Sequence, residues 1–112
     1  MLNELLKLLE KGPDNALLRF SIGSAYLKDS DIDQALQHLE KAVELDPRYS
    51  AAWKLYGKTL LQNGELEQAE SVLLQGIKVA TDKGDIQAAK EMEVFLRRLH
   101  KRVDDGDRSS SS

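Results

Sequence analysis

Residues 16–49 read ALLRFSIGSAYLKDSDIDQALQHLEKAVELDPRY, and residues 50–83 read SAAWKLYGKTLLQNGELEQAESVLLQGIKVATDK. Glycine, alanine, leucine and proline recur in and just before these stretches at a spacing of 34 residues, in the pairs Gly23/Gly57, Ala35/Ala69, Leu39/Leu73 and Pro13/Pro47. A fixed period of this length is typical of stacked helical hairpins, because each hairpin must bury its apolar side against the next one. The two stretches therefore predict an all-α solenoid of helical hairpins.

Each copy places its bulky, small and turn residues in the same order. The positions are Arg19, Ile22, Gly23, Tyr26, Ala35, Leu39 and Pro47 in the first copy, and Trp53, Tyr56, Gly57, Leu60, Ala69, Leu73 and Thr81 in the second. This order resembles the tetratricopeptide repeat, except that Arg19 stands where the repeat has an aromatic residue and Thr81 stands where it has a proline. The resemblance implies a right-handed superhelix of about six helices whose concave side binds peptides.

The two ends of the chain fit half repeats. Leucines at helical spacing before Pro13 predict a helix that corresponds to the second helix of a repeat whose first helix is missing. In this alignment Leu5 corresponds to Leu39, 34 residues later. The C-terminal segment predicts a capping helix with a charged outer face of Glu91, Arg97, Arg98 and Lys101. The predicted single domain covers residues 1–103, divided into a half-repeat helix 1–12, repeats 16–49 and 50–83, and a capping helix 85–102. Residues 104–112 lack apolar side chains and predict a disordered tail.

Composition narrows the class of protein. The net charge of -3 disfavours a nucleic-acid partner, which requires a basic excess. No apolar run approaches the length of a membrane-spanning helix, and an early Glu4 disfavours a signal peptide. The sequence has no cysteine, which fits a reducing compartment. We therefore expect a cytoplasmic protein without a membrane partner.

Catalytic and metal-binding constellations are missing from the sequence. No serine has the neighbours of an activated nucleophile, and the acidic residues alternate with basic ones. His38 and His100 are far apart, and both are expected to be exposed, so neither has partners for a metal site. We expect no enzyme activity, no cofactor and no metal.

The 34-residue period stacks side chains of the first helices in three columns. These are Phe20, Lys54 and Ala88; Ser24, Lys58 and Met92; and Leu27, Leu61 and Phe95. The resemblance implies that all nine line the peptide-binding groove. Lys54 and Lys58 would give it a positive centre with an apolar border, which favours a peptide with an acidic group and apolar anchors. A merely solvated lysine pair is the simpler alternative.

These patterns predict a protein–protein interaction module or adaptor. Phe20 and Ser24 stand where chaperone-binding members of the family place a lysine and an asparagine, so the resemblance does not extend to that carboxylate clamp. The alternative is a structural module that self-associates through its leucine-rich end, around Leu2, Leu6 and Leu9. The expected state in solution is a monomer or a weak homodimer.

Overall fold

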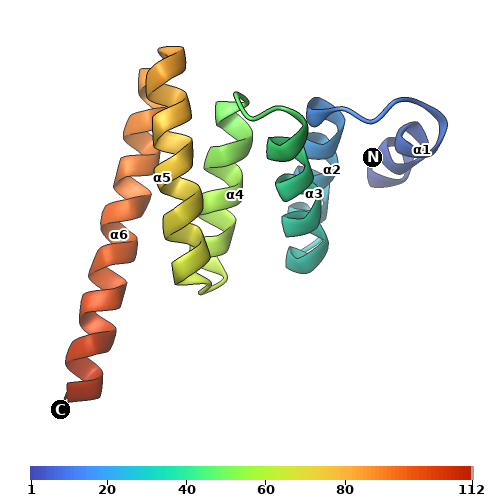
Figure 1. Cartoon of the computed structure of the whole chain (residues 1–112). Helices are drawn as coiled ribbons and strands as arrows, with labels where there is room; N and C mark the ends of the chain where they lie inside the picture. Colours follow the sequence, from blue (N-terminus) through green and yellow to red (C-terminus); the bar gives the residue numbers. More distant parts are fainter. Residues whose placement is uncertain (112) are drawn as a thin grey trace.

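The computed structural model describes the backbone of residues 1–111 and the side chains of residues 1–106, and within these limits it contains helices and no strand. The helices are α1 (Leu2–Lys11), α2 (Ala16–Lys28), α3 (Ile32–Leu45), α4 (Ser50–Gln62), α5 (Leu66–Lys83) and α6 (Ile86–Ser111). They stand side by side in chain order and form an elongated array of about 55 × 31 × 18 Å (Figure 1). The predicted all-α repeat fold is confirmed.

Local signals set the helix boundaries. The Asn15 side chain accepts a hydrogen bond of 2.8 Å from the backbone N–H of Leu18 and so caps α2. Asp31 caps α3 and Asp85 caps α6 in the same way. Ser50 is the first residue of α4, and its hydroxyl donates to a carboxylate oxygen of Asp85 at 2.6 Å.

The hairpins close tightly because glycine lets the paired helices approach each other. A Cβ atom at Gly23 would lie 3.0 Å from Cγ of Leu39, and one at Gly57 would lie 2.5 Å from Cδ2 of Leu73. Glycine at these two positions therefore permits the close approach of the paired helices. The largest fully buried side chains run along the whole stack: Ile22, Leu39, Leu60, Leu73, Met92 and Leu99.

The N-terminal helix is attached more loosely than the repeat pattern predicts. No residue of α1 is buried, and α1 lies at the end of the array beyond an extended linker (Figure 1). Leu5 is half-buried, whereas Leu39, its counterpart in the pattern, is fully buried. The difference follows because α1 has one neighbouring helix, α2, while α3 lies between α2 and α4.

The C-terminal half departs from the predicted boundaries. Thr81, which stands at a proline position of the repeat, does not end the helix, because α5 continues to Lys83 before Gly84 ends it with φ 84°. Helix α6 passes its predicted end at residue 102 and continues to Ser111, since no proline follows and one glycine costs a helix only about 1 kcal/mol. Of the predicted tail, Ser112 and the side chains from Asp107 onward lie outside the described residues. In the described part of the chain, no helix combines the length and apolar character that crossing a membrane requires.

Candidate functional site

One layer of the array consists of the first helix of each hairpin, namely α2 and α4, together with α6. Helices α4 and α6 pack against each other, and the ring of Phe20 on α2 lies 5.2 Å from that of Tyr49, the residue before α4. We call the half-buried and exposed side chains that this layer presents the α2–α4–α6 face: Phe20, Ser24 and Leu27 of α2, Lys54 and Lys58 of α4, and Glu91, Phe95 and Arg98 of α6.

Three of the nine predicted groove residues are buried in the core and do not belong to this face. They are Leu61, Ala88 and Met92, with exposed fractions of 6%, 5% and 0%. A Cβ atom on Gly76 of α5 would lie 2.5 Å from Sδ of Met92, so Met92 packs into the α5–α6 contact. Their prediction as groove residues is wrong in this structure, because their side chains are almost fully covered and offer a peptide little contact surface. Ala88 borders a hollow beside Lys54 and Glu91 but exposes only 5% of its surface there.

The burial of Ala88 and Met92 follows from a change of register at α6. Helix α5 has 18 residues and α3 has 14, so α5 is about one turn longer and delivers the chain to α6 at a different point. Ile86 is 53% exposed although Ala52, which precedes it by 34 residues, is fully buried. The first two predicted columns therefore hold between α2 and α4 and fail at α6, at Ala88 and Met92, whereas the third column fails at Leu61 on α4.

The two predicted lysines differ in their surroundings. Nζ of Lys54 lies 2.9 Å from a carboxylate oxygen of Glu91, and this contact lowers the pKa of Glu91 below its ordinary value. Glu91 was predicted on the outer side of the capping helix and instead faces α4. Lys54 is thus already paired, which removes half of the predicted positive centre.

Lys58, by contrast, lies beside an aromatic ring and a second cation. Nζ of Lys58 is 5.9 Å from the ring centroid of Phe95, and the guanidinium carbon of Arg98 is 5.8 Å from the same centroid. Among the side chains of residues 1–106, no carboxylate lies within ion-pair distance of either cation. Arg98 was predicted to face outward. Its position three residues after Phe95 is the sequence signal that places both on one side of α6.

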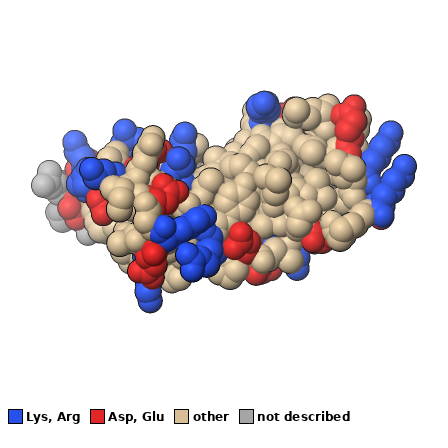
Figure 2. Space-filling view, turned by 90° about the horizontal axis from the view of Figure 1, so that it is seen from above, with Lys and Arg blue, Asp and Glu red and all other residues tan. Residues whose placement is uncertain are grey.

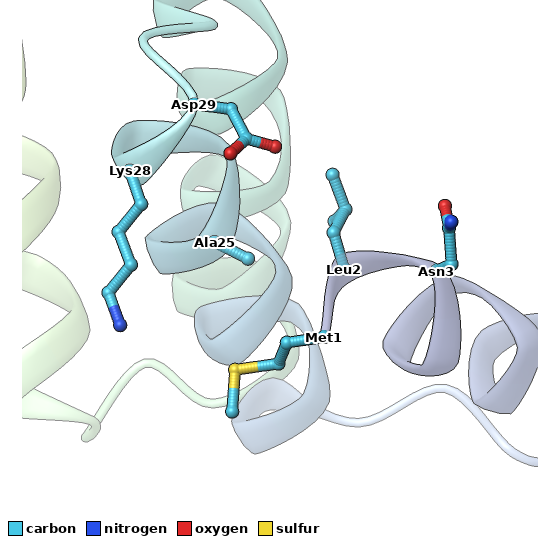
Figure 3. Close-up of a pocket in the computed structure, with 6 residues that line it drawn as sticks. All are labelled: Met1, Leu2, Asn3, Ala25, Lys28 and Asp29. Atoms are coloured by element: carbon cyan, nitrogen blue, oxygen red, sulfur yellow. The ribbon is translucent and has the colours of Figure 1, made fainter.

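Hollows lie where α1 meets the start of this face. One, of about 260 Å³, is bordered by Phe20 and Ser24 from α2 and by Met1 and Leu5 from α1. A neighbouring one, of about 310 Å³, has Met1, Leu2 and Asn3 on one side and Ala25, Lys28 and Asp29 on the other (Figure 3). The α2 end of the face is therefore indented, with a mostly apolar hollow beside Phe20 and with Lys28 and Asp29 at its edge, whereas the α6 end is cationic.

His38 is buried, so its prediction as a surface residue is wrong. Its exposed fraction is 9%, its Nδ1 lies 3.0 Å from a guanidinium nitrogen of Arg19, and its ring stacks on Tyr26 with centroids 5.5 Å apart. The pKa of His38 is lowered mainly by burial, and the positive charge of Arg19 lowers it further. Within residues 1–106, no three histidine, aspartate or glutamate side chains come together in a group that could hold a metal ion.

Comparison with known proteins places this geometry in a family. A profile of the tetratricopeptide repeat matches residues 26–92, and a second profile of the same repeat matches residues 2–47. The chain belongs to the tetratricopeptide-repeat family. The observed tetratricopeptide-repeat hairpins, α2–α3 and α4–α5, lie within the two predicted repeats.

Tetratricopeptide-repeat relatives match along most of the chain. A TPR repeat-containing protein of Pseudomonas aeruginosa is 50% identical over 99 residues, which are 88% of this chain and 94% of that protein. The solution structure of a Bordetella parapertussis protein is 42% identical, with a TM-score of 0.78 over 91% of this chain and 89% of that one. The Sgt2 TPR domain of Aspergillus fumigatus, at 20% identity, has a TM-score of 0.81 over 96% of this chain and 68% of that one. The last likeness concerns the fold alone.

Proposed function

We propose that this chain is a protein–protein interaction module that binds a segment of a partner protein along the α2–α4–α6 face. Tetratricopeptide-repeat proteins generally mediate protein–protein interactions, which supports the class of function. The observation that carries the choice of face is the arrangement of Lys58 and Arg98 around Phe95. It combines apolar surface with two cations that have no carboxylate partner among the described side chains.

The chemistry of this face defines the partner. A carboxylate of the partner can lie between Lys58 and Arg98, while an apolar side chain packs on the exposed part of Phe95. At the other end, the hollow beside Phe20 and Ser24 accepts a second apolar side chain. The proposed ligand is therefore a peptide segment with apolar anchors and at least one acidic group.

The apolar anchors should contribute more to affinity than the ion pairs. An exposed ion pair contributes less than about 1 kcal/mol, because water and salt screen it. Truncation of an aromatic anchor at an interface commonly costs about 2 kcal/mol or more. We therefore expect Phe95→Ala to weaken binding by at least about 10-fold and Lys58→Ala by about 3-fold.

Peptides selected from a random phage-displayed library on the immobilised chain provide the ligand for the test. Titration of a selected peptide should shift the backbone amide signals of α2, α4 and α6, and Phe95→Ala should weaken its binding. Leu74→Ala is the matched control, because Leu74 is an exposed apolar side chain on α5. Shifts confined to α3 and α5, around Gln37 and Gln75, would show that the opposite side binds and would refute the proposal.

A salt series separates the charge contribution from the apolar one. Lys58→Glu should weaken binding of an acidic peptide most at low ionic strength and less at high ionic strength. The effect of Phe95→Ala should change little with salt. Equal salt dependence for both variants would contradict the assignment of the acidic group to Lys58.

A further inference from the structure

We infer that the N-terminal end of the array is a self-association surface that binds a second copy of this chain. The surface is separate from the α2–α4–α6 cation site and does not depend on the function proposed above. It surrounds a hollow of about 400 Å³ between α1 and α2, whose lining includes Leu5, Leu8, Leu17 and Leu18 and no charged side chain. We call these four leucines the apolar end.

The apolar end carries projecting side chains as well as a hollow. Leu8 is 57% exposed and Leu17 is 64% exposed, and both stand at the rim of the hollow that they help to form. In a two-fold symmetric interface the same patch of both copies meets itself, so one patch must supply both the inserted group and its recess. A leucine of one copy inserted into the hollow of the other meets that requirement. Leu2, Leu6 and Leu9, which the sequence predicted for this role, are half-buried instead.

The charge balance of α1 permits two copies to meet at the apolar end. Helix α1 carries two acidic side chains, Glu4 and Glu10, and two basic ones, Lys7 and Lys11. Their charges cancel, although the whole chain has a net charge of -3. Two copies can therefore meet here without the repulsion that their overall charge would cause elsewhere. Seen from above, basic and acidic side chains both stand at the α1 end of the molecule (Figure 2).

The opposite end of the array explains why association should stop at two copies. The outer side of α6 exposes the charged side chains of Lys90, Glu93 and Arg97 around the exposed Ile86, so it is mainly charged and matches the apolar end of a further copy poorly. An array with one apolar end and one charged end forms a closed pair, whereas two apolar ends would allow an open filament.

Sedimentation equilibrium of the full chain tests the inference. The mass should rise from 12.6 kDa toward twice that value between about 1 µM and about 1 mM, because a patch this small supports a weak interface. Leu17→Glu and Leu8→Glu should each raise the dissociation constant at least about 100-fold, since every substitution occurs twice in a symmetric interface. Both side chains are exposed, so circular dichroism should show folded variants.

Leu74→Glu is the matched control, because Leu74 is 53% exposed on α5, away from the apolar end. This variant should dimerise like the unchanged chain. A wild-type chain that stays monomeric up to about 1 mM would overturn the inference. So would a loss of dimer in Leu74→Glu equal to that in Leu17→Glu.

Cross-linking gives a second and independent measurement. The chain has no cysteine, so a single introduced thiol reacts alone. With a short bis-maleimide, Leu17→Cys should give one band at the dimer mass, whereas Leu74→Cys should stay monomeric. Cross-linking of Leu74→Cys with none of Leu17→Cys would place the contact elsewhere and would refute the inference.

Discussion

Gly23 and Gly57 occupy the same position in the two repeats, but the partner helix approaches them differently. The nearest side-chain atom to a Cβ would be 3.0 Å away at Gly23 and 2.5 Å away at Gly57. Both glycines reduce helix propensity by up to about 1 kcal/mol relative to alanine. The tighter contact at Gly57 therefore makes glycine more necessary in the second repeat than in the first.

We expect Gly57→Ala to destabilise the chain by about 1–3 kcal/mol, because the added methyl group overlaps Leu73 by more than helix propensity restores. Gly23→Ala should have a smaller effect. Gly106→Ala is the control, because no atom lies within 4 Å of a Cβ built on this helical glycine. Urea denaturation followed by circular dichroism measures all three. A midpoint for Gly57→Ala at or above that of the unchanged chain would disprove the close approach.

His38 makes stability depend on pH. Burial and then the charge of Arg19 lower its pKa in the folded state below the ordinary value of 6.5, and the smaller effect of Asp14 acts in the opposite direction. The unfolded chain therefore binds a proton at a higher pH than the folded chain does. The stabilisation is complete above pH 6.5 and decreases as the pH falls through the folded-state pKa.

His38→Gln should remove this dependence, because glutamine stays neutral and can still accept from Arg19. Melting temperatures measured between about pH 7 and about pH 5 should decrease less in the variant than in the unchanged chain. His100→Gln is the control for the loss of a histidine from an exposed position. Identical pH profiles for the unchanged chain and His38→Gln would show that the ring does not titrate differently on folding.

At the scale of the helices, the length of α5 decides which side of α6 is buried. The pattern predicts that Met92 faces the groove, and it equates Ile86 with the buried Ala52. Helix α5 is four residues longer than α3 and the linker after it is two residues shorter, so α6 begins two residues later than the period predicts. A shift of two residues rotates a helix by about 200° and so reverses both assignments. Met92 then fills the space that Gly76 leaves, next to Cβ of Trp53.

This reversal can be tested with two substitutions on the same helix. Met92→Ala should reduce the free energy of unfolding by about 2–5 kcal/mol, since it leaves a cavity in the α5–α6 contact. Ile86→Ala should reduce it by less than about 0.5 kcal/mol, because Ile86 is mostly exposed. Thermal or urea denaturation of both variants decides the matter. A larger loss for Ile86→Ala than for Met92→Ala would restore the 34-residue register at α6.

The whole molecule is an array in which most helices touch only their neighbours. Its long axis of 55 Å separates α1 at one end from α6 at the other (Figure 1). Stability in such arrays is approximately a sum over repeats and their interfaces, so a change at one end has little effect at the other. Variants of the apolar end and of Phe95 should therefore act independently. The proposed dimer leaves the cationic end of the α2–α4–α6 face open to a peptide.

The repeat spacing by itself determined the all-α fold, the two hairpins and the glycine contacts, because these depend on residues that are close in sequence or on a strict period. The same information could indicate Phe20, Ser24, Leu27, Lys58 and Phe95 as surface residues of the first-helix layer. It could not place Leu61, Ala88 and Met92. Which residues of α6 are buried depends on the length of α5, because this helix sets the point at which α6 begins. The burial of Leu61 depends in turn on how α6 packs against α4.

Only the tertiary structure decided which charges remain available. Lys54 and Lys58 look equivalent in the sequence, yet Lys54 meets Glu91 while Lys58 meets Phe95 and Arg98. His38 is buried because Arg19 and Tyr26 reach it from the preceding helix. These contacts join residues on different helices, and sequence spacing is informative about such contacts only while the helices keep the register of the repeat.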